Sequence, residues 1–495
     1  MSATLRWGVP ILACLAIPLA PPGLARAEEK RTVRMAQAKP ASMDMGTEGA
    51  SGLPPALPAA SSLPTPPAPI AGDWGIGDFE RIAMERNPTL KQAASQYEAA
   101  LSRSFQAGLY PNPTAGYIQD QIGAFGEVKP RANGITAGGK ATPGEFVGAF
   151  VRQEIVTGGK LRLSRSKFAE EANAARWQSD AQAFRVRNGV RSQFFEVAAA
   201  QRLIEVRREL TKLNDQAVKT TEQLVNVGQA NEPDLLQSRV EANRARVALR
   251  SAENRHRAAW QGLTALIGAP ELDPAPVDDR ALEAESAPLE FNASLDRITR
   301  CSPELQAALA DIRRSQITVR RERAEPIPNL TVQASVGRNY EFGATGITVA
   351  GVQVSAPIPV FNRNQGTVRE AQSDLARDHS EYRRLVLSLR QRLADAFARY
   401  QDASQSVDDF QKASLPASKR AYDVMLANFR SRRAAWPQVL VSQRNYVSLS
   451  QEYIQSLLEL RKAETEIGGM LLVDGLSTPM APTTQGHIEA NPQPR

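Results

Sequence analysis

The sequence predicts a mainly α-helical protein with four β-strands, built from two copies of one structural unit. Three observations predict this class: proline motifs that recur along the chain, two very long segments of helical character, and four short segments of strand character. With 495 residues, the chain is longer than one compact core usually requires. Apolar residues make up 42% of it and the mean hydropathy is −0.35, which excludes a membrane protein made of many spanning helices.

The repeat is evident from the positions of the prolines. Three prolines recur at a single offset of 215 residues, namely Pro88, Pro111 and Pro113 as Pro303, Pro326 and Pro328. Later motifs recur at offsets of 203 and 204 residues, namely Val190 and Phe194 as Leu393 and Phe397, and Pro233 as Pro437. The change in offset indicates an insertion in the first copy, and the Gly-rich residues 123–144 are the obvious place for it. We therefore expect one unit at residues 73–293 and a second at residues 294–475.

Each copy is expected to begin with a helix followed by two strands. From Leu330 to Val336, apolar and polar residues alternate, which is the period of a half-buried strand. Three further strands are expected at Thr114–Ile122, Phe146–Ile155 and Ile347–Ile358. Segments of about ten residues have the length of a tilted strand that crosses a membrane. Alternation also suits a half-buried soluble sheet, but the order of elements and the export signal favour the membrane.

A long helix and then a shorter one complete each copy. From Leu161 to Val227 there are 67 residues with no proline and one glycine, which corresponds to a helix of about 100 Å. The counterpart runs from Val368 to Phe429 and is interrupted by Pro416. A narrow apolar seam at heptad spacing follows each helix, consisting of Val190, Phe194, Val197 and Ile204, and of Leu393, Phe397, Tyr400 and Val407. Because the seams are narrow, we expect a separated protomer to be poorly folded.

The N-terminus carries an export signal. Arg6 precedes an apolar run at residues 7–19, and Ala25–Ala27 forms a small-residue cleavage motif, so residues 1–27 are expected to be a cleaved signal peptide. Cys14 loosely resembles a lipidation site, and its modification stays open. Two segments are expected to be disordered, a linker rich in Pro, Ala and Ser at residues 28–72 and a tail at residues 476–495.

The composition argues against catalysis and against nucleic-acid binding. Lys and Arg number 60 against 53 Asp and Glu, a net charge of +7 without any block of like charge. Three histidines and two cysteines leave little material for a metal site. The segment Thr157–Lys160 resembles a phosphate-binding loop, but Glu154 stands where the first glycine is required and Leu161 where Ser or Thr is. We expect no enzyme activity, no cofactor and no bound metal.

Over residues 73–475 the chain resembles the TolC-like outer-membrane efflux family. The matching motifs are Val225–Gly228 before Pro233–Leu236, and Gln153–Lys160 at the end of the second strand. The resemblance implies a homotrimer. Four strands from each protomer would contribute to one β-barrel in a Gram-negative outer membrane, and the long helices would form one periplasmic α-barrel.

Two further segments, Leu109–Pro113 and Pro357–Gly366, look most like the heavy-metal branch of CzcC- and CusC-type proteins. The resemblance then implies a passive conduit for heavy-metal cations. Its partners would be a periplasmic membrane-fusion adaptor, an inner-membrane RND-type pump and outer-membrane lipid. A drug-efflux or type I protein-secretion channel stays an alternative, because substrate choice lies mostly with the pump. A secreted coiled-coil scaffold without a pore is the alternative from a different class.

Two groups of site residues are expected. The first lies at the periplasmic tip, where helix hairpins reverse direction and dock to the partner: Gly228, Pro233, Asp234, Leu235, Arg430, Arg432, Arg433, Trp436 and Pro437. The second lies at the junctions of helices and strands: Pro111, Pro113, Gly158, Gly159, Pro326, Pro328, Pro357 and Pro359.

Three residues of the first tip are expected to end one helix and start the next. Gly228 can end a helix in the left-handed conformation, Pro233 suits the first turn of the return helix, and Asp234 places a carboxylate at its positive end. The second tip lacks the family's usual glycine and is rich in arginine instead. These arginines either form a basic ring that faces the adaptor and the lumen, or stay solvated at the end of a helix. Both interpretations stay open.

Overall fold

A computed structural model describes residues 74–120, 146–228, 231–339, 346–431, 433–434 and 436–479. All of them belong to one unit, which spans residues 65–495. The expected signal peptide, linker and Gly-rich insertion lie outside the described residues, as do Arg432 and the side chain of Arg430.

In its described residues the first copy contains four helices and two strands, with the expected first helix divided in two at Asn87. Its elements are α1 (Ile76–Arg86), α2 (Pro88–Gln106), β1 (Thr114–Asp120), β2 (Phe146–Ile155), α3 (Lys160–Asn226) and α4 (Glu232–Ile267). The Oδ1 atom of Asn87 accepts a hydrogen bond from the Thr89 amide at 2.9 Å, and Pro88 occupies the first turn of α2. The kink at Asn87 is therefore a cap followed by a proline, as in other helix N-termini.

The second copy repeats this order after a short 3-10 helix, η1 (Asp279–Leu282). Its elements are α5 (Phe291–Cys301), α6 (Pro303–Ala324), β3 (Leu330–Asn339), β4 (Ile347–Ser355), α7 (Gln365–Asp409), α8 (Leu415–Arg430) and α9 (Trp436–Gly468). The division into α5 and α6 falls before Pro303, the counterpart of Pro88. The predicted fold class, mainly helical with four strands, is confirmed.

The two long helices match the prediction closely. α3 contains 67 residues, shifted by one from the expected range. In the second copy, a π-helical turn, η2 (Phe410–Ser414), joins α7 to α8, and Pro416 lies in the first turn of α8. A π turn inserts one residue, which lets the chain pass a proline that can neither donate a hydrogen bond nor fit an ideal helix. At the expected interruption the helix is therefore widened locally by one π turn, and it continues from α7 into α8.

All four strands form one antiparallel sheet in the order β1-β2-β3-β4. The pairing of β2 with β3 joins the two copies, for example through Ile155 opposite Leu330. β4 ends at Ser355, three residues before the predicted end, because a Pro-x-Pro segment follows and proline donates no ladder hydrogen bond.

The seam of α3 belongs to a cluster larger than the heptad pattern indicated. Val190, Phe194 and Val197 are fully buried, together with Phe79 of α1 and Trp260 of α4. The Phe79 ring lies 5.9 Å from both the Phe194 and the Trp260 rings. The short helix α1 therefore closes the groove between α3 and α4.

The seam of α7 forms a second cluster. Leu393 is fully buried and Tyr400 is 8% exposed, packed with Ile298 of α5 and Leu305 of α6. The Tyr400 hydroxyl accepts a hydrogen bond from the Leu289 amide at 3.1 Å. Each copy therefore buries its seam against its own short helices.

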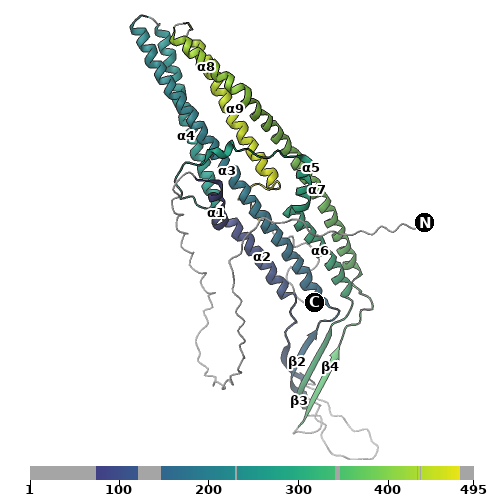
Figure 1. Ribbon diagram of the computed structural model, residues 1–495. Helices are drawn as coiled ribbons and strands as arrows, with labels where there is room; N and C mark the ends of the chain where they lie inside the picture. The colour runs from purple at the N-terminus through teal and green to yellow at the C-terminus, as the bar shows by residue number, and fades with distance from the viewer. Residues whose placement is uncertain are drawn as a thin grey trace, which may run out of the picture. The chain divides into compact units, whose positions relative to one another are not determined.

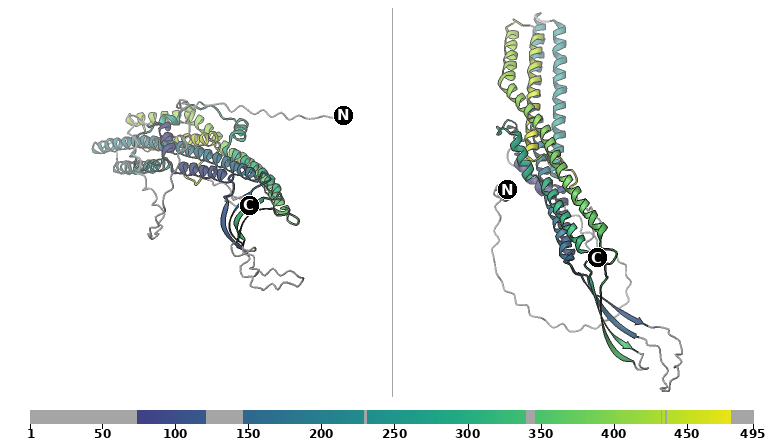
Figure 2. Two further views of the ribbon diagram at one scale, coloured as in Figure 1. Left: turned by 90° about the horizontal axis from the view of Figure 1, so that it is seen from below. Right: turned by 90° about the vertical axis from the view of Figure 1, so that its right-hand side faces the viewer.

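Within this unit, the sheet and the turns of the helix hairpins lie at opposite ends (Figure 1). β2 leads directly into α3, which rises about 100 Å before α4 returns beside it. α8 and α9 form the second hairpin, and α9 also packs on α3 and α7. Two further views show the hairpins side by side (Figure 2). In the described part of the chain, every helix is too short or too polar to cross a bilayer.

Candidate functional site

One face of the sheet is apolar and exposed. Residues that pair across neighbouring strands share a face, and the rung Tyr117–Ala149–Val336–Ala350 is apolar throughout. On the same face, Tyr117 is 65% exposed and Val352 is 77% exposed. Further exposed apolar residues of this face are Val151, Ile155, Leu330 and Val354. An apolar surface of this extent marks contact with lipid or with another protein.

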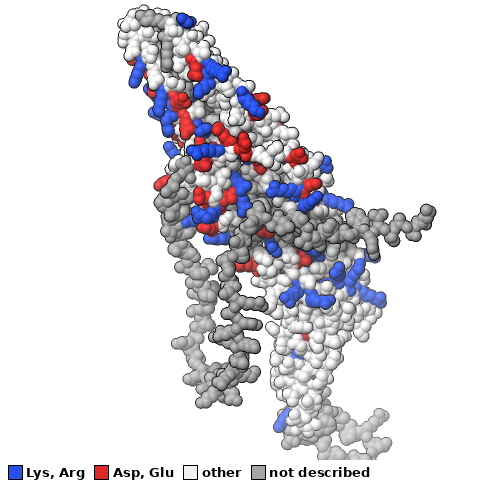
Figure 3. Space-filling model, in the orientation of Figure 1, with Lys and Arg blue, Asp and Glu red and all other residues white. Residues whose placement is uncertain are grey.

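The other face of the sheet is polar in its half nearer the helices, while Phe150 and Ile347 lie on it further away. Its rung of Thr114, Arg152, Gln333 and Gln353 crosses all four strands. Arg152 donates from Nε and Nη2 to Oε1 of Gln333 at 2.9 and 2.7 Å. On the side shown in Figure 3, charged side chains crowd the helices and are sparse over the strands. A sheet with one apolar and one polar face is suited to separate hydrocarbon from water.

The two edges of the sheet are the remaining feature of this end. Among the described residues, β1 pairs with β2 alone and β4 pairs with β3 alone. Each edge therefore presents a row of backbone N–H and C=O groups without a partner strand. In hydrocarbon such groups require pairing, so the sheet is complete only when further strands close it.

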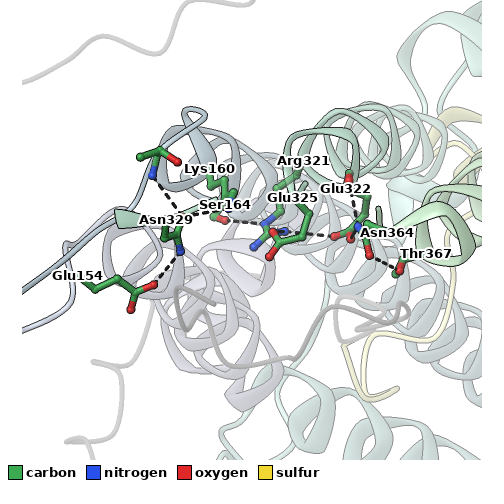
Figure 4. A network of polar contacts seen from close by, with 10 residues as sticks. Glu154, Lys160, Ser164, Arg321, Glu322, Glu325, Asn329, Asn364 and Thr367 are labelled. Carbon is green, nitrogen blue, oxygen red and sulfur yellow. Dashed lines mark hydrogen bonds and ion pairs between the residues drawn. The ribbon is translucent and has the colours of Figure 1, made fainter. Parts of the chain in front are cut away.

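A buried polar network fixes the sheet to the helices (Figure 4). Asn329, directly after Pro328, accepts hydrogen bonds at Oδ1 from Nζ of Lys160 at 2.9 Å and from the Thr157 amide at 3.3 Å. Its Nδ2 donates to Oε1 of Glu154 at 2.8 Å. Lys160 is 3% exposed, and burial lowers the pKa of its amine. One amide side chain thus joins β2, the start of α3 and the entry to β3.

The network continues into α6 and α7. Arg321 is 5% exposed and donates to Oγ of Ser164 at 3.3 Å and to Oε2 of Glu325 at 2.6 Å. Asn364 donates from Nδ2 to the carbonyl oxygen of Glu322 at 3.0 Å and to its Oε2 at 2.7 Å. Asn364 has a φ of 60°, a conformation that Asn tolerates better than most residues. These contacts hold the helix ends together where the strands begin.

The predicted junction residues lie around this network. The carbonyl of Pro111 accepts a hydrogen bond from Gln153 at 2.9 Å, and the carbonyl of Pro328 accepts one from Thr157 at 2.5 Å. The remaining prolines flank the strands: Pro113 lies before β1, Pro326 before β3, and Pro357 and Pro359 after β4. Gly158 and Gly159, with φ of 66° and 68°, turn the chain from β2 into α3.

The residues that bind one another at the junction were missed from the sequence. Arg321 and Asn329 bind side chains of β2 and α3 that lie at least 157 residues earlier in the chain, such as Ser164 and Lys160. The sequence did offer one signal, namely closeness to the predicted junction residues. Lys160 directly follows Gly159, and Asn329 directly follows Pro328.

An ionic cluster lies further along the same helices, away from the strands. Lys167 of α3 is 8% exposed, and burial lowers its pKa to about 8. Burial raises the pKa of Asp311 on α6 to about 6, partly offset by Arg314. Arg103 of α2 donates to Oε1 of Glu171 at 2.6 Å. The cluster therefore crosses α2, α3 and α6 between the network and the apolar cores.

At the opposite end, the first tip follows the predicted geometry. Gly228 has a φ of 73°, and its amide donates to the carbonyl of Val225 at 2.9 Å. Pro233 lies in the first turn of α4. Oδ2 of Asp234 accepts a hydrogen bond from the Asn231 amide at 3.4 Å, which caps the helix, and Leu235 is half-buried beside it.

The second tip reverses without a glycine in the described residues. The amide of Arg433 donates to the carbonyl of Asn428 at 2.7 Å, which ends α8, while Pro437 lies in the first turn of α9. Trp436 is 8% exposed and packs on the Phe429 ring at 5.0 Å. Arg430 is the last residue of α8.

The two hairpins contact each other. Ala217 of α3 shares an apolar cluster with Trp436 and Leu440. Arg444 of α9 pairs with Glu241 of α4. The two hairpins are therefore packed against each other near the end away from the sheet.

The comparison with known families follows the same two-copy pattern. The model of the family described as "Outer membrane efflux protein" matches residues 81–269 and residues 295–471. The chain belongs to this family. It is thus an outer-membrane efflux channel, and the family predicted from the sequence is confirmed.

The chain is similar to a metal-resistance protein and to solved outer-membrane channels. The chain is 26% identical over 419 residues to the cobalt-zinc-cadmium resistance protein CzcC of Cupriavidus metallidurans, covering 83% of this chain and 93% of that protein. The structure of CusC matches with a TM-score of 0.66 at 17% identity, covering 83% of this chain and 98% of that one. The open MtrE outer membrane channel of Neisseria gonorrhoeae matches with 0.62 at 19%, covering 81% and 90%. These structures share the fold of the efflux channels.

Among the described residues, no group of three or more His, Cys, Asp or Glu side chains is placed to hold a metal ion. Cys301 is half-buried. The described structure thus has a sheet with two chemically different faces, a junction held by polar contacts, and two helix hairpins at the opposite end.

Proposed function

We propose that this protein forms a passive homotrimeric conduit that exports heavy-metal cations across the outer membrane. One observation carries the proposal: a four-stranded sheet with an apolar face, a polar face and two unpaired edges continues directly into a 67-residue helix. Such a sheet fits a membrane only as part of a closed barrel.

Closure by copies of the same chain is consistent with strand direction. With four antiparallel strands in the order β1-β2-β3-β4, β1 and β4 run in opposite directions. β4 of one protomer can therefore pair antiparallel with β1 of the next, and the ring closes without an edge. The number of three protomers follows from the resemblance to the TolC-like family.

The similarity to CzcC supports metal cations as the substrate, because cobalt, zinc and cadmium resistance is in that protein's name. In our proposal an inner-membrane RND-type pump supplies the energy. A periplasmic adaptor docks on the tip around Gly228, Asp234 and Arg433, where the buried Trp436 holds the second hairpin together. In the same proposal, a signal peptide that is cleaved after Ala27 directs the chain itself out of the cytoplasm.

Metal tolerance of cells that lack this protein tests the proposal. A deletion strain should lose tolerance to Co²⁺, Zn²⁺ and Cd²⁺, and the intact gene should restore it. Loss of tolerance to an apolar drug alone would favour the drug-efflux alternative. Unchanged tolerance to metals and to drugs would contradict export by this protein.

Two neighbouring residues provide matched variants for this experiment. Val352 lies on the apolar face and Gln353 on the polar face of the same strand. Val352→Lys should abolish complementation, because a lysine facing lipid costs about 2–4 kcal/mol near the bilayer midplane, whereas Gln353→Lys should complement. Equal behaviour of the two variants would contradict the assignment of the faces.

A further inference from the structure

We propose that Arg152 makes the sheet section of the channel prefer anions over cations, an inference that rests on the proposed function. Arg152 lies on the polar face, in the rung with Thr114, Gln333 and Gln353. If the apolar face meets lipid, this rung faces the water-filled interior. A charge at this position acts on every ion that passes.

The guanidinium of Arg152 is held in a fixed position. Its Nε and Nη2 both donate to Oε1 of Gln333, at 2.9 and 2.7 Å. Its central carbon lies 5.4 Å from the centroid of the Phe150 ring. A Cβ atom at Gly116 would lie 2.8 Å from that ring, so the absence of a side chain at Gly116 gives the ring its place. The charge is therefore fixed to the wall rather than free to follow the solvent.

The two partners of this guanidinium among the described residues are uncharged. The nearest acid along the same face is Glu154, two residues further on β2. Its carboxylate is bound to Asn329, which also accepts a hydrogen bond from the amine of Lys160. Lys160 therefore offsets the charge of Glu154, whereas Arg152 keeps a net positive charge on the polar face.

In a trimer, three such guanidinium groups would surround one section of the channel. Fixed charges between low-dielectric walls raise the local concentration of ions of opposite sign. A metal cation would pass this section most readily together with anionic ligands. The chemical class that the site selects is thus a small anion, free or bound to the exported metal.

Ion selectivity of the purified full-length protein in planar lipid bilayers tests this inference. The reversal potential in a KCl gradient gives the permeability ratio of Cl⁻ to K⁺. We expect Arg152→Gln to lower this ratio by at least about threefold. Arg152→Lys, which keeps the charge, should retain most of it. Gln353→Glu, which adds an acid to the same rung and leaves the arginine intact, should lower it as well.

The matched control is Arg338→Gln. Arg338 pairs with Val147 and Thr348 on the opposite, apolar face, so its loss removes the same charge without changing the polar face. An unchanged ratio in Arg152→Gln, or an equal fall in Arg338→Gln, would overturn the inference and leave the conduit in place. If the unaltered protein forms no pores, the proposed function fails, and the inference fails with it.

Discussion

At the scale of single residues, the buried charges near the junction are the most informative. Asp311 is surrounded by Arg314 of its own helix, Glu171 of α3 and Asp378 of α7. Burial raises its pKa from 3.8 to about 6, so the carboxylate costs stability when it is charged. Such a charge is tolerated in a structural position only if the helices around it hold it in place.

Asp311 should make stability depend on pH. Between pH 4 and 6 the folded state binds a proton that the unfolded state has lost, so the free energy of unfolding falls as pH rises through this range. Asp311→Asn should remove this dependence and stabilise the protein at neutral pH, by roughly 2–3 kcal/mol at most. Thermal unfolding in detergent from pH 4 to 7 measures the effect.

The control for Asp311 is an exposed carboxylate. Asp408 on α7 pairs with Lys412 at the surface and is 57% exposed. Asp408→Asn should leave the pH dependence of the melting temperature intact. A wild-type melting temperature that rises with pH, or that keeps its slope in Asp311→Asn, would contradict the assignment.

At the scale of elements, the second tip depends on one aromatic pair. Trp436 packs on Phe429 at 5.0 Å, and its Nε1 has no hydrogen-bond partner among the described residues. Trp436→Ala should destabilise this hairpin locally by about 3–5 kcal/mol, whereas Trp436→Phe should cost much less, because no hydrogen bond is lost. Hydrogen exchange of the segments before and after the turn should rise in the alanine variant alone. Equal exchange in both variants would show that the ring contact is not what closes the tip.

The arginines of the same tip are the test of docking. Replacing Arg430, Arg432 and Arg433 together by serine should leave the amount of trimer in the membrane unchanged. Because the charge at the docking surface is lost, the variant should alter coupling to the pump or the leak conductance.

A control with the same loss of charge is Lys412, Lys419 and Arg420 changed to serine, all exposed and further from the tip. If substrate tolerance and single-channel conductance are unchanged in the tip variant, its arginines are merely solvated surface groups. The same result in both variants would also exclude a specific role.

How much the sequence predicts differs between elements. The bounds of α3 follow from the distribution of proline and glycine, because a helix needs only local signals to begin and end. The tip at Gly228 and Pro233 follows in the same way. The second tip does not, because the hydrogen bond from the Arg433 amide to Asn428 replaces the glycine and leaves no motif.

The junction network shows most clearly which contacts could not be predicted from the sequence. Arg321 and Asn329 are polar residues on either side of the prolines at 326 and 328, where a sequence alone would suggest a solvent-exposed loop. In the structure Arg321 is buried, and both residues contact α3. Side chains that pair across more than 150 residues leave no periodic pattern in a single sequence, so these contacts could not be predicted from it. The sheet, in contrast, could be predicted strand by strand, while its register and the position of Arg152 beside Gln333 needed the structure.

At the scale of the whole molecule, the central claim is that the open sheet is closed by other copies of the chain. The exposed apolar face and the two unpaired edges have the same explanation, since both are satisfied in a barrel surrounded by lipid. The claim concerns one contact, that of β4 with β1 of the next protomer.

Disulfide formation between these strands tests the claim directly, in a protein whose Cys301 is replaced by serine. Tyr117 on β1 and Ala350 on β4 occupy opposite ends of one rung, about 14 Å apart within a protomer, so they are too distant to form a disulfide there. Tyr117→Cys is combined in turn with cysteine at four positions of the same face of β4, namely Thr348, Ala350, Val352 and Val354. Oxidation of outer membranes should give covalent dimers and trimers at one register of this scan. If the protein is present in the outer membrane and no position yields a product larger than the monomer, the sheet is not closed by copies of this chain.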